Sequence, residues 1–128
     1  MSMEKDFIYG DDTYVLIGIA MEIHRLLGKG FAEVVYKDAF EFELKVRGIE
    51  YEREKEFEVA YKNVILPHKF YADFVIDDKI ILEIKSKAKI LDQHYAQVIN
   101  YLVISKLKVG LIVNFHEDSL QYKRVVFS

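Results

Sequence analysis

The stretch YADFVIDDKIILEIKS, residues 71–86, constrains the fold of this 128-residue chain more than any other. Two runs of strand-forming apolar residues are separated by a short charged loop, a pattern typical of a β-hairpin. Charged residues interrupt both runs: Asp73 the first, and Glu83 and Lys85 the second. A half-buried hairpin keeps its polar residues on one face, so the pairing register must account for these three positions.

The length of the loop decides whether the charged residues meet. A two-residue loop at 77–78 would place Asp73 opposite Leu82, so that polar and apolar residues share a face. A three-residue loop at 77–79 instead pairs Phe74 with Leu82 and Asp73 with Glu83, and this is the register we predict. It gives the first strand a wholly apolar face, which consists of Phe70, Ala72, Phe74 and Ile76.

The predicted register places the carboxylates of Asp73 and Glu83 on neighbouring strands, with Cβ atoms about 5 Å apart. Two like charges at that distance destabilise a sheet unless something balances them. A shifted pKa, the ammonium of Lys85 or a divalent cation could do so. Mg²⁺ favours one or two carboxylates together with waters and substrate phosphate oxygens. The hairpin alone also leaves open a sheet face of ion pairs without any chemistry.

Composition indicates one domain over residues 1–128 with a substantial core, since 52% of the residues are hydrophobic. No apolar run reaches the length of a membrane span and the N-terminus lacks a signal-peptide pattern, so we expect a cytoplasmic protein without membrane contact. The net charge of −3 argues against strong non-specific binding to nucleic acid. Two local basic clusters remain, formed by Lys85, Lys87 and Lys89 and by Lys106 and Lys108.

The remaining pattern predicts an α/β chain in which helices cover a sheet. Helical spacing favours helices over 11–30, 31–48 and 91–107, and alternating or continuous apolar residues favour strands over 49–63, 69–77, 79–86, 108–115 and 120–127. The strands over 49–63 and 120–127 are the predicted edges, and hence candidate surfaces for a homodimer. The second helix is expected to bury the face formed by Val35, Ala39, Phe42 and Val46.

Four motifs occur in one order along the chain. They are G-F-A-E-V-V-Y (Gly30, Glu33, Tyr36), the strand around Asp73, E-I-K (Glu83, Ile84, Lys85), and Q-V-I-N-Y (Gln97, Tyr101). The Asp and ExK pattern resembles the core of the PD-(D/E)XK nuclease superfamily, although the usual preceding proline is missing. QxxxY resembles the motif of its recombination-repair exonuclease branch, and GxxExxY resembles the signature of a family of small proteins assigned to that superfamily.

The resemblance implies a restriction-endonuclease-like three-layer core, with a central mixed β-sheet flanked by α-helices. It implies Mg²⁺ or Mn²⁺ as cofactor, held by Asp73, Glu83, the carbonyl of Ile84, and Glu33. Lys85 would position or activate the attacking water. Gln97 would orient water or substrate, and Tyr101 would support the site or contact the nucleic-acid backbone. The implied catalytic residues are Asp73, Glu83, Lys85, Glu33, Gln97 and Tyr101.

The expected function is therefore metal-dependent hydrolysis of phosphodiester bonds in DNA or RNA. The small, acidic chain would bind nucleic acid weakly, as a homodimer, or with the help of a partner. The alternative is a non-catalytic module on the same fold that binds nucleic acid or protein. Four tyrosines are candidates for stacking on bases, although most of the tyrosines are expected in the core: Tyr9, Tyr14, Tyr36 and Tyr71.

Overall fold

A computed structural model describes residues 8–90 and 92–127 of the chain. Three helices and seven strands lie within these residues, in the order expected for an α/β protein. They are α2 (Gly10–Leu27), α3 (Glu33–Arg47), β1 (Tyr51–Phe57), β2 (Ala60–Tyr61), β3 (Val64–Ile65), β4 (Phe70–Ile76), β5 (Ile80–Lys85), α4 (Asp92–Ser105), β6 (Val109–Asn114) and β7 (Gln121–Val126). None of the helices described is both long and apolar enough to cross a membrane, and the cytoplasmic location stays a prediction.

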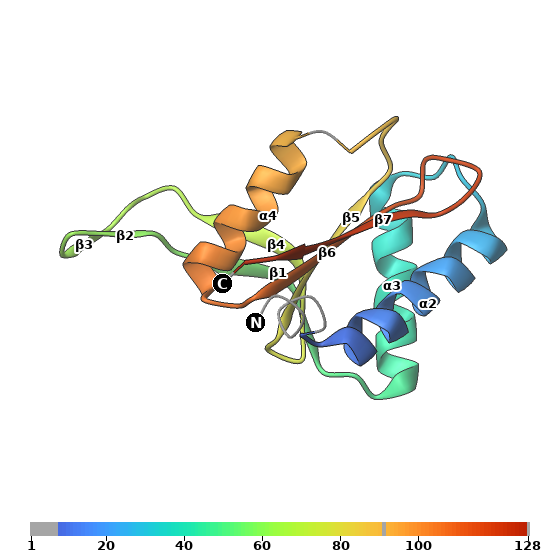
Figure 1. The fold of residues 1–128 in the computed structure, drawn as a ribbon, viewed down its shortest axis with the longest axis horizontal. Helices are drawn as coiled ribbons and strands as arrows, with labels where there is room; N and C mark the ends of the chain where they lie inside the picture. The colour runs from blue at the N-terminus through green and yellow to red at the C-terminus, as the bar shows by residue number, and fades with distance from the viewer. Residues whose placement is uncertain (1–7, 91, 128) are drawn as a thin grey trace.

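Five strands form one mixed sheet in the order β1-β4-β5-β6-β7. Only the β5 and β6 pair is parallel, and helix α4 makes the crossover between these two strands. Helices α2 and α3 cover one face of the sheet and α4 covers the other (Figure 1). The predicted three-layer α/β architecture is confirmed, as are both predicted edge strands. The strand predicted over 49–63 is divided, because β2 and β3 form a separate small hairpin.

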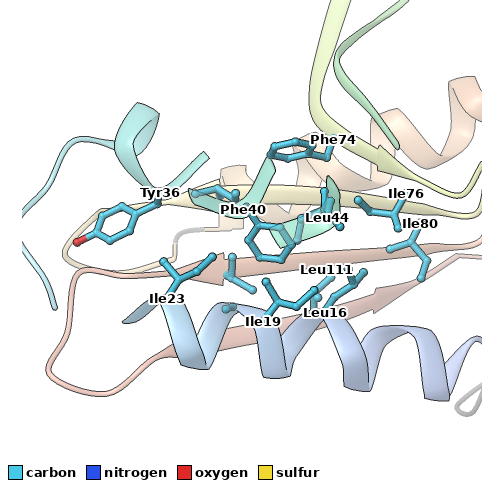
Figure 2. Close-up of a cluster of buried hydrophobic side chains, with 14 of the residues drawn as sticks. Leu16, Ile19, Ile23, Tyr36, Phe40, Leu44, Phe74, Ile76, Ile80 and Leu111 are labelled. Atoms are coloured by element: carbon cyan, nitrogen blue, oxygen red, sulfur yellow. The ribbon is translucent and has the colours of Figure 1, made fainter. Parts of the chain in front are cut away.

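The larger core cluster lies between the sheet and the helix pair α2 and α3 (Figure 2). Helix α3 contributes Tyr36, Phe40 and Leu44, all fully buried. The face predicted for this helix was therefore wrong at two of its four residues: Ala39 packs against this cluster, but Phe42 and Val46 are 64% and 67% exposed. Both sets recur at helical spacing, but the buried set contains two aromatic rings, and burying them removes more apolar surface from water.

The register predicted for the hairpin is confirmed. Ile76 pairs with Ile80 and Phe74 pairs with Leu82. Asp77 and Asp78 both have positive φ angles, 53° and 55°, and the turn is closed by the Lys79 N–H, which donates to the Ile76 carbonyl at 2.9 Å. The loop is thus the expected three residues.

The prediction of one continuous apolar face on the first strand was wrong. Phe74 belongs to the cluster against α2 and α3, whereas Ala72 belongs to the cluster against α4. Residues two apart normally share a face, so the alternation shifts at the residue between them, Asp73. The neighbouring strand shifts at the same level, where Glu54 has a φ of 52°. The sheet is therefore irregular at the residue that carries the first motif carboxylate.

Candidate active site

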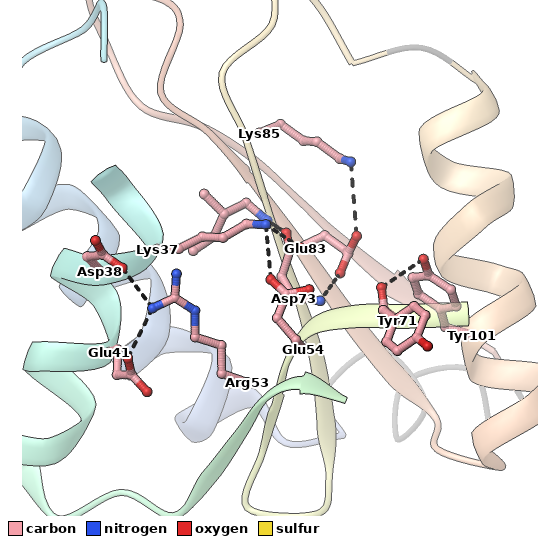
Figure 3. Close-up of polar contacts among 11 residues, drawn as sticks. Lys37, Asp38, Glu41, Arg53, Glu54, Tyr71, Asp73, Glu83, Lys85 and Tyr101 are labelled. Atoms are coloured by element: carbon pink, nitrogen blue, oxygen red, sulfur yellow. Dashed lines mark hydrogen bonds and ion pairs between the residues drawn. The ribbon is translucent and has the colours of Figure 1, made fainter. Parts of the chain in front are cut away.

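Two carboxylates from adjacent strands lie at the centre of the site (Figure 3). The Asp73 N–H donates to Glu83 Oε2 at 2.7 Å, and the Ile84 N–H donates to Asp73 Oδ2 at 2.8 Å. Each carboxylate thus binds the backbone of the opposite strand, beyond the last regular pair of the ladder, Phe74 with Leu82. The two residues are 8% and 2% exposed. Side chains replace ladder bonds here, which satisfies two buried amides where the sheet is irregular.

The environment of Glu83 opposes its ionisation. Burial, and next the charge of Asp73, raise the pKa of the Glu83 carboxyl to about 8, although Lys85 and Lys37 act in the opposite direction. Each carboxylate uses one oxygen for the backbone bond and directs the other toward an ammonium group. Asp73 Oδ1 lies 2.9 Å from Lys37 Nζ, and Glu83 Oε1 lies 4.0 Å from Lys85 Nζ. The pair therefore lies between two cations.

Lys85 lies where the sequence placed it, beside the carboxylate pair at the end of β5. Its side chain is 13% exposed, and 4.0 Å from Glu83 is the outer limit of an ion pair. A loosely held ammonium next to two carboxylates can donate hydrogen bonds to a water or to a phosphate oxygen. The geometry thus agrees with the role predicted for Lys85 without testing it.

Glu33 lies at the first turn of α3 and binds the residue that follows the ExK motif. Its Oε2 accepts the Ser86 N–H at 3.0 Å, so the start of α3 contacts the end of β5. The structure does not bring Glu33 into a common cluster with Asp73 and Glu83. Among residues 8–90 and 92–127, no three Asp, Glu, His or Cys side chains are arranged to hold a metal. The role of Glu33 as a metal ligand stays a prediction.

The two motif residues of α4 lie on the opposite side of the pair from α3. Tyr101 is 3% exposed and its hydroxyl donates to the Tyr71 carbonyl at 3.1 Å. Burial, and then the charges of Glu83 and Asp73, raise the pKa of Tyr101 to about 12. Of the two roles predicted for Tyr101, this geometry favours support of the site over contact with nucleic acid. Gln97 is half-buried one turn earlier on the same helix.

The GxxExxY residues connect α2, α3 and β5. The φ of 106° at Gly30 lies in the region that favours glycine. The Tyr36 hydroxyl donates to the Gly28 carbonyl at 2.7 Å and accepts the Phe31 N–H at 3.3 Å. Tyr36 is fully buried and stacks on Phe115, with ring centroids 4.2 Å apart. Its prediction as a base-stacking residue was therefore wrong, because it positions the loop that precedes α3.

Two residues of the site were not predicted from the sequence. Lys37 contacts Asp73 and also lies 3.3 Å from Glu54 Oε1. Its spacing of one helical turn after Glu33 places both residues on one face of α3, but this spacing does not indicate a contact with Asp73. The other residue is Asn114 at the end of β6, which is 1% exposed and forms two hydrogen bonds with the backbone of Lys87. Its Oδ1 accepts the Lys87 N–H at 3.0 Å, and its Nδ2 donates to the Lys87 carbonyl at 2.8 Å.

Comparison with known proteins identifies a family and a similar fold. A family model described as the PD-(D/E)XK nuclease superfamily matches residues 10–125. The crystal structure of SSO0001 is similar, with a TM-score of 0.58 and 24% sequence identity. The similarity covers 72% of this chain and 48% of that chain, so this chain spans about half the length of SSO0001. At this identity the likeness concerns the fold. No curated protein matches the chain.

Proposed function

Because the chain belongs to the PD-(D/E)XK nuclease superfamily, we propose that it is a metal-dependent nuclease that hydrolyses phosphodiester bonds in DNA or RNA. Within that superfamily, the Gly30, Glu33 and Tyr36 pattern supports assignment to the GxxExxY family. The nearly complete span of the family match, from 10 to 125, includes all four motifs.

One observation carries the proposal: Asp73 and Glu83 are buried side by side although both are acidic. Burial and repulsion between the two groups disfavour the state in which both are ionised, and they raise the pKa of Glu83. A sheet without a function would gain stability from apolar residues at these positions. Costly pairs of ionisable groups are typical of sites that do chemistry.

The residues present fit a hard divalent cation. Each carboxylate has one oxygen that is not engaged by the backbone, Asp73 Oδ1 and Glu83 Oε1, and each of these oxygens faces a lysine ammonium group. Carboxylate and carbonyl oxygens are the donors that Mg²⁺ and Mn²⁺ prefer. Asp73, Glu83 and the carbonyl of Ile84 would hold the ion. Glu33 would bind the ion directly or through an intervening water. When bound, such an ion lowers the pKa of water and screens charge on the phosphate.

The chain's own groups would perform the remaining steps. The Lys85 ammonium would donate a hydrogen bond to the attacking water or to a non-bridging phosphate oxygen, which stabilises the negative charge that develops there. Tyr101 holds the Tyr71 carbonyl and so fixes the strand next to Asp73. Gln97, half-buried on the same helix, would orient water or substrate.

The proposed substrate is nucleic acid. The protein would bind it weakly, as a homodimer, or with the help of a partner. Support comes from the lysines that follow the ExK motif, Lys87 and Lys89, which extend positive charge beyond Lys85 along the chain. The overall charge of −3 provides no general attraction. Strands β1 and β7 are the edges through which two copies could associate.

The test is metal-dependent cleavage. Purified protein would be titrated with Mg²⁺ and Mn²⁺ and incubated with linear, circular and single-stranded DNA and with RNA. Glu83→Gln and Lys85→Met would remove the proposed functional groups while nearly preserving side-chain volume. Glu58→Gln and Lys79→Met are matched controls, because they make the same charge changes at the exposed Glu58 and at Lys79 in the hairpin loop.

Cleavage that requires metal and is lost in both site variants, but not in the controls, is the expected result. Metal binding that depends on Glu83, with no cleavage of any substrate, would favour the alternative of a non-catalytic module. Cleavage that survives both site variants would contradict the assignment of the site.

A further inference from the structure

Lys37 makes the closest contact between a lysine and the carboxylate pair. Its Nζ lies 2.9 Å from Asp73 Oδ1 and 3.3 Å from Glu54 Oε1. The Lys37 side chain is 17% exposed and that of Asp73 12% exposed. Burial alone would lower the pKa of Lys37, but the bonds to Asp73 and Glu54 outweigh burial and raise it above its usual value. Lys37 is therefore a charged group held in a largely dehydrated place.

The position of the ammonium is informative. Asp73 uses Oδ2 to accept the Ile84 N–H, and Lys37 occupies the other oxygen, Oδ1. That oxygen is the one left for a metal ion. An ammonium and a divalent cation that share one carboxylate oxygen repel each other strongly in a buried place. The two cations therefore exclude each other at Asp73.

A second partner is available to the lysine. The Glu54 side chain is 51% exposed, so this second partner of Lys37 lies between the buried pair and solvent. The φ of 52° at Glu54 is uncommon for a residue other than glycine, and it lies at the level where the alternation of β1 shifts. Uncommon backbone conformations cluster at sites of function. Glu54 can keep Lys37 at the mouth of the site when Asp73 is released.

We propose, on the basis of the nuclease function above, that Lys37 neutralises Asp73 until a divalent ion displaces it, and that the displaced ammonium then binds a phosphate group of the nucleic acid. Lys37 would thus be a substrate-binding residue that is ion-paired with the metal ligand Asp73 until the metal binds. Asp73 is thus paired with a cation in both states: with Lys37 in the metal-free protein and with the metal ion in the metal-bound protein. Only in the metal-bound protein is Lys37 available, together with Lys85, to bind phosphate.

The first experiment measures metal binding without nucleic acid. Ca²⁺ and Mg²⁺ are titrated calorimetrically into the wild type and into Lys37→Met, in the same buffer and at the same pH. Lys37→Met should bind metal about tenfold more tightly, because no ammonium has to be displaced. Lys37→Arg should stay close to the wild type. Lys29→Met is the charge-matched control, since Lys29 pairs with the exposed Asp118, and its metal affinity should not change.

The second experiment measures binding of a short single-stranded oligonucleotide in Ca²⁺, with the strand checked for integrity afterwards. Lys37→Met should bind it more weakly, and the slope of log affinity against log salt should fall by about one. If circular dichroism shows that Lys37→Met does not fold, both measurements are made on Lys37→Gln instead.

The outcomes separate this inference from the proposed function. Equal metal affinities of the wild type and Lys37→Met, together with metal-dependent cleavage by the wild type, would overturn the inference alone. Tighter metal binding with an unchanged salt slope would overturn the phosphate-binding role. Absence of metal binding by all variants would overturn the proposed function and the inference with it.

Discussion

Glu83→Gln is expected to stabilise the metal-free protein, by an amount that grows with pH. Glu83 is 2% exposed, and burial, followed by the charge of Asp73, raises the pKa of its carboxyl from 4.5 to about 8. Glutamine is neutral and nearly isosteric. Its amide oxygen can accept the Asp73 N–H that Glu83 Oε2 accepts now. The substitution therefore removes the ionisable group and keeps the bond between the strands.

The sign follows from proton binding. The unfolded chain releases the Glu83 proton near pH 4.5, but the folded protein releases it near pH 8. Between these values the folded state binds more protons, so the free energy of unfolding decreases as the pH rises. Each pH unit in this window costs up to about 1.4 kcal/mol, so the total cost is about 3 kcal/mol near pH 7 and about 4 kcal/mol near pH 8. The Gln variant does not incur this cost.

The assay is urea unfolding followed by circular dichroism in EDTA, at about pH 5, 6.5 and 8. The advantage of Glu83→Gln should be small at the lowest pH and should rise to the stated size at the highest. Thermal unfolding should show a gain of roughly 3–5 °C per kcal/mol for a domain of this size. Glu58→Gln, at an exposed position, should show no such trend. An advantage that is absent or independent of pH would refute the reasoning.

Three further substitutions test the supports of the site. Asn114→Ala removes two hydrogen bonds to the backbone N–H and carbonyl of Lys87 and leaves both groups without this partner. It should lower the free energy of unfolding in urea by roughly 2–3 kcal/mol, and it should lower any cleavage rate. Tyr36→Phe keeps the buried ring but loses the hydroxyl's bond to the loop before α3, so it should cost about 1–2 kcal/mol, with a lower Tm in a thermal scan. Gly110→Ala would place a Cβ 2.4 Å from Val98 Cγ1; it should cost about 1–3 kcal/mol, and adding Val98→Ala should recover part of the loss, which a double-mutant cycle measures.

The hairpin register could be predicted because one residue of slip moves every side chain to the other face. Only the three-residue loop kept Phe74 and Leu82 together on an apolar face, and the structure pairs them. The layer arrangement followed from the same reasoning, since strands alternating with helices favour a sheet covered by helices. The hairpin register and the layer arrangement each depend on many residues, and the patterns of these residues predict the same structure.

The buried face of α3 could not be predicted from helical spacing, because two faces of this helix carry apolar residues at that spacing. Phe42 is 64% exposed, whereas Phe40, two residues earlier, is fully buried. The choice depends on the tertiary partner: Phe40 packs against Phe74, with ring centroids 6.1 Å apart. A partner on another element is not visible in a local pattern.

Lys37 was missed for a similar reason. In the sequence it is one charged residue on an amphipathic helix, and such residues commonly lie in solvent. Its contact with Asp73 joins residues 36 positions apart and depends on how α3 crosses the sheet. The motifs indicated which residues form the carboxylate pair, but the cations that balance the pair depend on the packing of α3.

The irregularity of the sheet and the position of the site have one physical cause. If the alternation of β4 continued through Asp73, this carboxylate would lie on a regular face and its amide would pair with a backbone carbonyl. Instead the Asp73 amide is bonded by Glu83 and the Ile84 amide by Asp73. The strands are joined at this level by the same side chains that would bind a metal. Truncating either carboxylate would remove a ligand and also leave a buried amide unpaired, so Asn and Gln are the substitutions that separate the loss of charge from the loss of structure.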